Sequence, residues 1–389
     1  MTLTSSVEVL IVGATPAGLT LAIKLARLGV NALLIDRLRS QAAAPSGALL
    51  RARSLEGLEE IDVASRLVEA GLPIRRLGIS ERERRLLTID FSGLDTAYPF
   101  ALMCPQDAAA AILRERLSQL GGRIRDGVEF LAVDDERGRT RIRLRSKQGE
   151  QVLHASWIVG CDGARSAVRD AAGLASAGGV RRGFLIADAL LDQPRRLDQA
   201  DLLLTRQGPL AVAPLPGGSV RIVAAASDIQ TMDRDRVVEI LDGWGLGHGG
   251  ARVASLLHWS PMELRCGATS PPRSGRVLLC GSAAHVHDPL WGEGMGAGIE
   301  DALSLAIPLS AAIRLGDENL LRHWAARRLA DRRRGAALQA RLLRIATAPS
   351  GAERLMRSVA ARAVGRVPGV PGRMAATLSG LERRGGAPS

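Results

Sequence analysis

The chain has very few aromatic residues and almost no lysine. Aromatic side chains make up 3% of its 389 residues, and arginine carries nearly all of the formal charge of +12, since the only lysines are Lys24 and Lys147. Nucleic-acid binding usually needs a basic face with stacking aromatics. The composition therefore argues against a nucleic-acid partner, while the positive charge suits an anionic cofactor or substrate.

Cysteine is scarce, and its spacing suits neither a metal site nor a disulfide framework. No C-x-x-C pair occurs, and each cysteine lies beside an apolar, strand-like segment, which predicts buried free thiols at Cys104, Cys161, Cys266 and Cys280. The run His285-x-His287-Asp288 lacks an evident third ligand, so no metal site is predicted.

Long apolar runs and hydrolase motifs are missing as well. No stretch of 18 uncharged apolar residues occurs, and the first apolar run, Val9 to Val12, is too short for a signal peptide. These absences predict a cytoplasmic protein without stable membrane insertion. No G-x-S-x-G is present, so nucleophilic hydrolysis has little support.

The first 36 residues carry the pattern of a βαβ unit with a nucleotide-binding turn. A strand-like run, Val7 to Val12, leads into the glycine-rich turn Gly13 to Gly18, and a helix is expected over Ala17 to Leu28. The second strand, Asn31 to Asp36, ends in an acid that can bind a ribose. Strand, turn, helix and acid together indicate a dinucleotide site at the helix N-terminus.

Two further glycine-rich segments follow buried strands. The second, Gly160 to Arg169 (GCDGARSAVR), opens a short helix. The third, Gly275 to Ala302, contains a strand, a turn at Gly281-Ser282 and a glycine-rich loop, and its helix is expected to start near Gly298 or Ile299. From Leu320 onward the chain is expected to be helical and rich in arginine.

Taken in order, these segments resemble the para-hydroxybenzoate hydroxylase type of FAD-dependent monooxygenase, which includes aromatic-polyketide hydroxylases. The segment CDGARSAVR, from Cys161 to Arg169, is the most specific match. The resemblance implies an α/β fold: a Rossmann-like, glutathione-reductase-type FAD-binding domain with an inserted mixed or antiparallel β-sheet substrate domain and C-terminal helices. The implied boundaries are 1–72, 101–175 and 266–320 for the cofactor domain, 73–100 and 176–265 for the substrate domain, and 321–389 for the helices.

The resemblance also implies residue roles. FAD would be held by Gly13, Thr15, Ala17, Gly18, Asp36, Arg37, Arg53, Gln106, Asp162, Ser282, Pro289, Gly292, Gly294 and Met295. NAD(P)H would be a transient reductant, and Arg221 would reach an anionic group of an apolar small-molecule substrate. A monomer or homodimer is expected. The implied reaction is hydroxylation or epoxidation of an apolar, natural-product-like molecule with dioxygen.

The chain departs from the family pattern at the flavin loop. Serine stands at Ser282 where the family has aspartate, and the loop that follows carries residues unlike the family's. Residues of this loop and two nearby histidines are also the candidate catalytic groups: His285, His287, Asp288, Trp291 and Glu293. These departures keep two alternatives open. One is a cyclase, isomerase or dehydratase that has lost FAD or keeps it only as structure, and the other is a non-catalytic binding protein.

Overall fold

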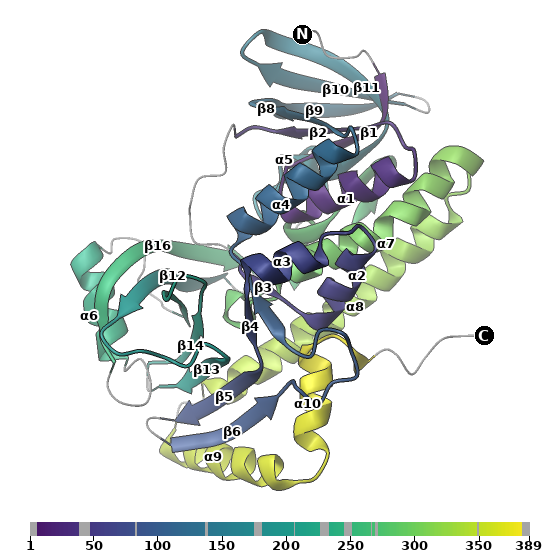
Figure 1. Ribbon diagram of the computed structural model, residues 1–389. Coiled ribbons are helices and arrows are strands. Elements are labelled where there is room, and N and C mark those ends of the chain that lie inside the picture. Colours follow the sequence, from purple (N-terminus) through teal and green to yellow (C-terminus); the bar gives the residue numbers. More distant parts are fainter. Residues whose placement is uncertain are drawn as a thin grey trace.

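The computed structural model describes residues 6–38, 47–81, 84–136, 139–174, 181–205, 207–225, 233–244, 251–265, 267–268, 271–347 and 350–382. Two large β-sheets lie at different ends of the molecule in Figure 1, and a layer of helices connects them.

The eight-stranded sheet contains the predicted βαβ unit. Its central strand β1 (Ser6–Val12) pairs in parallel with β11 (Gly149–Gly160) on one side and β2 (Ala32–Asp36) on the other. The order is β18-β19-β11-β1-β2-β8, with β10 added antiparallel to β11 and β9 added antiparallel to β10. The other bounds are β8 (Arg123–Asp126), β9 (Glu129–Glu136), β10 (Arg139–Ser146), β18 (Arg273–Ser274) and β19 (Val277–Leu279).

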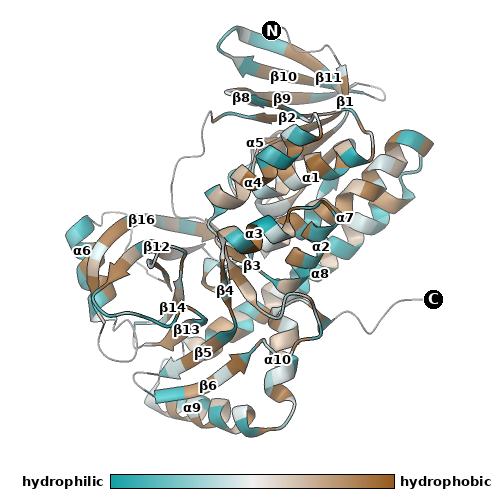
Figure 2. Cartoon of the chain, in the orientation of Figure 1, coloured by the Kyte–Doolittle hydropathy of each residue, from teal (hydrophilic) through white to brown (hydrophobic). Residues whose placement is uncertain are grey.

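Three helices cover one face of this sheet and form the largest core. They are α1 (Pro16–Arg27), α4 (Gln106–Gln119) and α7 (Gly294–Leu315), and their apolar residues pack on Val9 and Ile11 of β1. By length and composition alone α7 could cross a membrane, but 61% of its most apolar window is buried, and its brown and pale turns in Figure 2 lie among the packed helices. It is therefore placed as a core helix of this fold.

Helix α7 begins at Gly294, so the predicted start near Gly298 is wrong. The glycines inside its first turns allow close packing: a Cβ on Gly296 would lie 2.8 Å from Ser54 Oγ, and one on Gly298 would lie 3.3 Å from the Ala17 Cβ. Glycine has a low intrinsic helix propensity. Tertiary packing outweighs that propensity here, which explains the error.

The seven-stranded sheet has the order β16-β12-β15-β14-β13-β5-β6 and is antiparallel except where β13 pairs with β5. In Figure 2 the labelled strands β12, β14 and β16 carry brown, apolar stretches. The bounds are β5 (Arg76–Glu81), β6 (Arg84–Asp90), β12 (Arg181–Leu191), β13 (Gln199–Leu204), β14 (Pro209–Pro214), β15 (Val220–Ala225) and β16 (Val253–Arg265).

The remaining elements join the two sheets or close their edges. Helix α8 packs against α7, while α9 and α10 pack against β6, so the C-terminal helices reach from one sheet to the other (Figure 1). The bounds are β3 (Leu49–Leu50), α2 (Ala52–Glu59), α3 (Ala64–Ala70), β4 (Leu72–Ile74), β7 (Ala101–Met103), α5 (Ala167–Ala171), α6 (Arg234–Gly243), β17 (Gly267–Ala268), η1 (Gly281–Ala283), β20 (His285–Val286), η2 (Pro289–Trp291), α8 (Asn319–Ala346), α9 (Gly351–Arg366) and α10 (Val370–Leu378).

This arrangement confirms the predicted α/β class, with a parallel nucleotide-type sheet and a second, mostly antiparallel sheet. The predicted free, buried thiols are confirmed at Cys104, Cys161 and Cys280, whereas Cys266 lies outside the described residues.

Candidate active site

The turn between β1 and α1 is built by backbone contacts that only glycine permits. Gly13 has a φ of +106°, and a Cβ there would lie 2.5 Å from the carbonyl oxygen of Cys161. Thr15 caps α1: its hydroxyl accepts a hydrogen bond from Gly18 N (3.3 Å) and donates one to Cys161 O (3.0 Å). The threonine that departs from the glycine pattern is thus accommodated as a helix cap.

Asp36 braces the same turn. Its Oδ2 accepts a hydrogen bond from Ala14 N (2.7 Å), and its Oδ1 accepts one from Leu38 N (2.8 Å). Asp36 does not line the large cavity described below, and neither does the exposed Arg37. The role this structure gives Asp36 is therefore to hold the turn.

Asp162 also has a structural partner. Its carboxylate accepts hydrogen bonds from Ser166 Oγ (2.5 Å) and Val168 N (3.2 Å) at the start of α5. Burial raises the pKa of Asp162, and these hydrogen bonds act in the opposite direction. Its neighbours Gly163 and Ala164, rather than Asp162, face the cavity.

A single cavity of about 860 Å³ runs from the N-terminus of α1 to the seven-stranded sheet. That volume lies in the range usual for small-molecule and cofactor sites. It brings together fourteen of the twenty predicted site residues: Thr15, Ala17, Arg53, Gln106, Arg221, Ser282, His285, His287, Pro289, Trp291, Gly292, Glu293, Gly294 and Met295. The other six do not line it: Gly13, Gly18, Asp36, Arg37, Asp162 and Asp288.

Asp288 is one of the candidate catalytic acids, and the structure places it elsewhere. It is 3% exposed, and its Oδ1 accepts a hydrogen bond from Leu290 N (3.0 Å), which caps the short helix η2. An Asp-Pro sequence at a helix start is a common capping arrangement. The carboxylate therefore shapes the loop instead of facing the cavity.

His285 belongs to a buried ionic cluster around Asp301. The fully buried carboxylate of Asp301 accepts hydrogen bonds from Gly281 N (3.0 Å), His285 Nε2 (2.9 Å) and Arg328 Nε (2.8 Å), and it also contacts Arg332. Burial raises the pKa of Asp301, while Arg328 acts to lower it. The cluster ties the Gly281 turn to α7 and α8.

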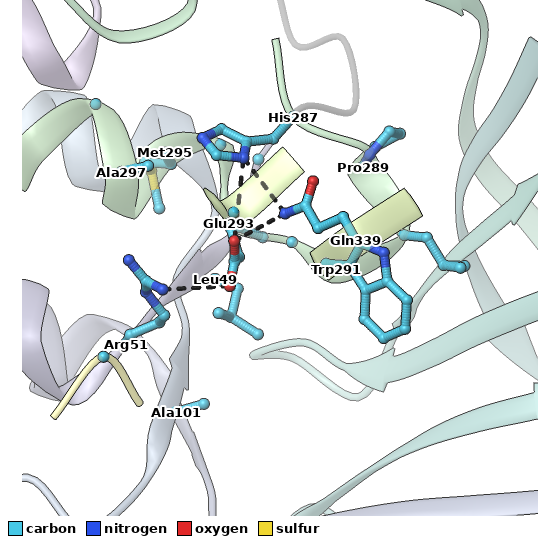
Figure 3. A pocket seen from close by; sticks show the side chains of 18 of the residues that line it. Leu49, Arg51, Ala101, His287, Pro289, Trp291, Glu293, Met295, Ala297 and Gln339 are labelled. Carbon is cyan, nitrogen blue, oxygen red and sulfur yellow. Dashed lines mark hydrogen bonds and ion pairs between the residues drawn. The ribbon is translucent and has the colours of Figure 1, made fainter. Parts of the chain in front are cut away.

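A second polar network crosses the cavity wall (Figure 3). Arg51 Nη1 donates a hydrogen bond to Glu293 Oε1 (3.2 Å), and Gln339 Nε2 lies 2.9 Å from Glu293 Oε2 and 3.3 Å from His287 Nδ1. Arg51 Nη2 also bonds Glu300 (3.0 and 3.1 Å). Arg51 is therefore shared between the two acids Glu293 and Glu300.

His287 is neutral in this network. Burial is the largest cause that lowers its pKa from 6.5 to about 4, and Arg51 contributes in the same direction. The candidate histidine can therefore serve as an uncharged hydrogen-bonding group at pH 7.

The lowered pKa of His287 predicts a pH-dependent stability. Because the unfolded chain binds this proton below about pH 6.5 and the folded chain only below about 4, the free energy of unfolding should rise with pH between 4 and 6.5. The expected contribution is about 3 kcal/mol. Urea unfolding between pH 4.5 and 7 should show a shallower rise for His287→Gln, whereas the control His323→Gln, at an exposed site on α8, should keep the wild-type slope. Equal slopes for wild type and His287→Gln would count against the lowered pKa.

Towards the seven-stranded sheet the cavity becomes apolar. Its walls there include Leu77, Ile186, Leu202, Val223 and Met262, and the half-buried Trp291 packs beside them. This end suits an apolar ligand.

The predicted anion-binding residue on this sheet, Arg221, already has a partner. Its Nε and Nη2 each donate a hydrogen bond of 2.7 Å to the carboxylate of Asp188, and both side chains are buried. The two residues face each other in the β12–β15 register. This bidentate pairing neutralises the arginine, so Arg221 does not present a free charge to a substrate.

Comparison with known proteins agrees with a nucleotide-type cofactor site. The family model described as an FAD binding domain matches residues 6–337. This chain belongs to that family of FAD-binding proteins. It is 36% identical over 329 residues to 6-methylpretetramide 4-monooxygenase of Streptomyces rimosus, covering 83% of this chain and 59% of the relative. It is also 30% identical to rifampicin monooxygenase of Streptomyces venezuelae, covering 90% and 74%.

Solved structures show the same fold. The p-nitrophenol 4-monooxygenase PnpA of Pseudomonas putida DLL-E4 superposes with a TM-score of 0.88 at 20% identity, covering 98% of this chain and all of that one. BexE, studied for oxidation during BE-7585A biosynthesis, gives 0.79 at 31% identity, covering 97% and 77%. The chain spans about three fifths of the length of the first curated relatives it matches.

The cavity fits the family's cofactor, FAD. The first turn of α1 reaches it at Pro16 and Ala17, where a helix N-terminus favours a phosphate, and Arg53 adds a positive charge. Beyond them Gly292 packs closely against Leu49, since a Cβ on Gly292 would lie 3.1 Å from the Leu49 Cβ. A helix N-terminus, a positive charge and an apolar wall thus follow one another along one cavity.

The residues that sequence reasoning missed are Arg51, Glu300, Asp301, Arg328 and Gln339. Arg51 stands two positions before the predicted Arg53, and Asp301 lies within the third glycine-rich segment, so both were near recognised motifs. Gln339 had no local signal, because its contacts with Glu293 and His287 join α8 to a loop about 50 residues away.

Proposed function

We propose that this chain is an FAD-dependent monooxygenase that adds one oxygen atom of dioxygen to an apolar, polycyclic, natural-product-like substrate, with NAD(P)H as reductant. The single supporting observation is the continuous cavity that joins the N-terminus of α1 to an apolar sheet face. Two relatives, 6-methylpretetramide 4-monooxygenase and rifampicin monooxygenase, support a polycyclic substrate.

The division of roles follows the cavity. FAD, once reduced, supplies the activation of dioxygen. Thr15, Ala17, Arg53, Gln106 and Ser282 would hold it, with the loop Pro289–Met295 along its ring system. The corresponding proposed domains are 1–72, 101–175 and 266–320 for the cofactor, 73–100 and 176–265 for the substrate, and 321–389 for the closing helices.

The chain's own groups orient the substrate and exclude water. The apolar wall around Ile186, Val223, Met262 and Trp291 would bind a flat, apolar molecule and keep the reaction site dry. Glu293, paired with Arg51, and the uncharged His287 would offer hydrogen bonds there. We propose that the protein acts in the cytoplasm on a small molecule as a monomer or homodimer.

The absorbance spectrum of the purified protein, followed by an FAD titration, tests the proposal. A flavin band or micromolar binding, and NADPH oxidation that depends on 6-methylpretetramide or rifampicin as probe, would support it. No FAD binding at high micromolar concentration would overturn it and favour a cofactor-independent enzyme, with His287 and Glu293 as acid and base.

Ser282 offers a test of the cofactor end. Replacing Ser282 with aspartate restores the acid that the family pattern has at this position, and a charge-assisted hydrogen bond adds roughly 1.5–3 kcal/mol, so FAD affinity should rise about 10- to 100-fold. Flavin fluorescence titration measures the change. Ser282→Asn, which is similar in size and uncharged, is the matched control and should stay near wild type; unchanged affinity in Ser282→Asp would contradict the assigned cofactor position.

A further inference from the structure

Gln339 lies between the two candidate acid–base groups of the site. Its amide nitrogen Nε2 is 2.9 Å from Glu293 Oε2 and 3.3 Å from His287 Nδ1, while the direct distance from His287 Nδ1 to Glu293 Oε2 is 4.0 Å (Figure 3). Each of the two amide hydrogens therefore has its own acceptor. Gln339 belongs to α8, and the other two residues belong to the loop before α7.

This arrangement decides which nitrogen of His287 carries the proton. An amide nitrogen only donates, so Nδ1 must accept, and in a neutral imidazole the proton is then on Nε2. His287 lines the cavity, and its Nε2 is buried and has no hydrogen-bond partner among the described residues. Buried polar groups are nearly always paired, so this N–H can donate to an acceptor outside the described residues.

The charged groups around His287 would favour a different state without Gln339. Glu293 and Asp301 act to stabilise a protonated ring, while Arg51 and Arg328 act against it, and His285 packs edge-to-face at 4.5 Å. With Gln339 removed, the nearest acceptor for Nδ1 would be the Glu293 carboxylate. A proton on Nδ1 would then be stabilised by a charged partner.

We propose that Gln339 is a positioning residue: it fixes neutral His287 as the Nε2–H tautomer and so provides a permanent hydrogen-bond donor for a carbonyl or hydroxyl oxygen of a bound ligand. The tautomer does not depend on the proposed function. Only the identity of the ligand, flavin or substrate, rests on it.

Nitrogen-15 NMR of protein labelled at histidine tests the tautomer directly, because the chain has only six histidines. The His287→Gln variant assigns the signal. Wild type should show a protonated Nε2 and an unprotonated Nδ1, unchanged between pH 5.5 and 8. Gln339→Glu should invert the tautomer and raise the pKa of His287 into this range, and Gln339→Leu should do the same through Glu293. Arg341→Gln, on the exposed side of α8, is the control and should leave the signal unchanged.

A protonated Nδ1 in wild type, or an unaltered His287 signal in both folded Gln339 variants, would overturn the proposal. The wild-type spectrum alone can do so, even if a variant fails to fold.

Ligand titration distinguishes the two sources of the acceptor oxygen. A shift of the Nε2 signal on addition of FAD alone assigns the acceptor to the flavin, and a shift that appears only with 6-methylpretetramide assigns it to the substrate. If both ligands bind without any shift, the donor role is wrong. If FAD does not bind, the proposed monooxygenase function fails while the tautomer measurement still stands.

In activity assays, kcat of Gln339→Leu should fall as the pH rises, with a midpoint near the ordinary histidine pKa of about 6.5. The protonated ring still donates from Nε2, whereas the neutral ring of this variant would carry its proton on Nδ1. Wild type should show no such step. A uniform loss of activity at every pH would indicate a merely structural role and would contradict the proposal.

Discussion

Asp301→Asn is expected to lower the free energy of unfolding by about 3–5 kcal/mol, because it leaves buried arginines without their counter-charge. Asp301 is fully buried and contacts Arg328 and Arg332 from α8, His285 and Gly281 N. An asparagine of the same shape can accept hydrogen bonds but cannot neutralise either guanidinium. Urea unfolding at pH 7 measures the loss.

The matched control is Asp317→Asn. Asp317 is exposed, and its Oδ1 accepts a hydrogen bond from Asn319 N (2.8 Å). Asparagine caps a helix about as well as aspartate, so this variant should remain within roughly 0.5 kcal/mol of wild type. If Asp301→Asn behaved like the control, the buried cluster would not be the junction between the Gly281 turn and the C-terminal helices.

Gly13→Ala is expected to reduce FAD affinity at least 100-fold and to destabilise the fold by about 3 kcal/mol or more. The residue has a φ of +106°, and its new Cβ would lie 2.5 Å from the carbonyl oxygen of Cys161. The strained φ of Gly13 and the clash with Cys161 both involve backbone atoms, so neither can be relieved by rotating a side chain.

Gly93→Ala is the comparison for this effect. A Cβ on Gly93 meets no atom within 4 Å, and its φ lies outside the left-handed region, so stability and FAD affinity should both stay close to wild type. Flavin fluorescence titration and urea unfolding should be run on both variants. Wild-type FAD affinity in a folded Gly13→Ala protein would be incompatible with cofactor binding at this turn.

The nucleotide-binding half of the fold could be predicted from local sequence. The β1–α1–β2 unit, the CDGARSAVR segment and the glycine-rich third segment each join a short, apolar, strand-like run to a turn and a helix, and such patterns depend on neighbours along the chain. The start of α7 was misplaced because three of its first five residues are glycine, and the reason for that glycine lies in α1 and α2.

The roles of the polar residues are harder to predict from sequence for a physical reason. A carboxylate after a strand can bind a ligand or cap the next turn, and the same residue types suit both. Asp36, Asp162 and Asp288 each accept a hydrogen bond from a backbone N–H within their own turn or that of a neighbouring strand. Arg221 likewise meets Asp188 only because β12 and β15 pair in a particular register.

The sequence by itself determined the class of fold, the position of the dinucleotide turn and the loop that faces the cavity, because these depend on short-range periodicity and on glycine. Only the tertiary structure decided which charges remain available. Arg51 pairs with Glu293 across 242 residues, and Gln339 contacts His287 across 52, and no local pattern encodes such contacts. The chemistry of this site depends on those long-range pairings, because burial makes the protonation of each group depend on its nearest partner.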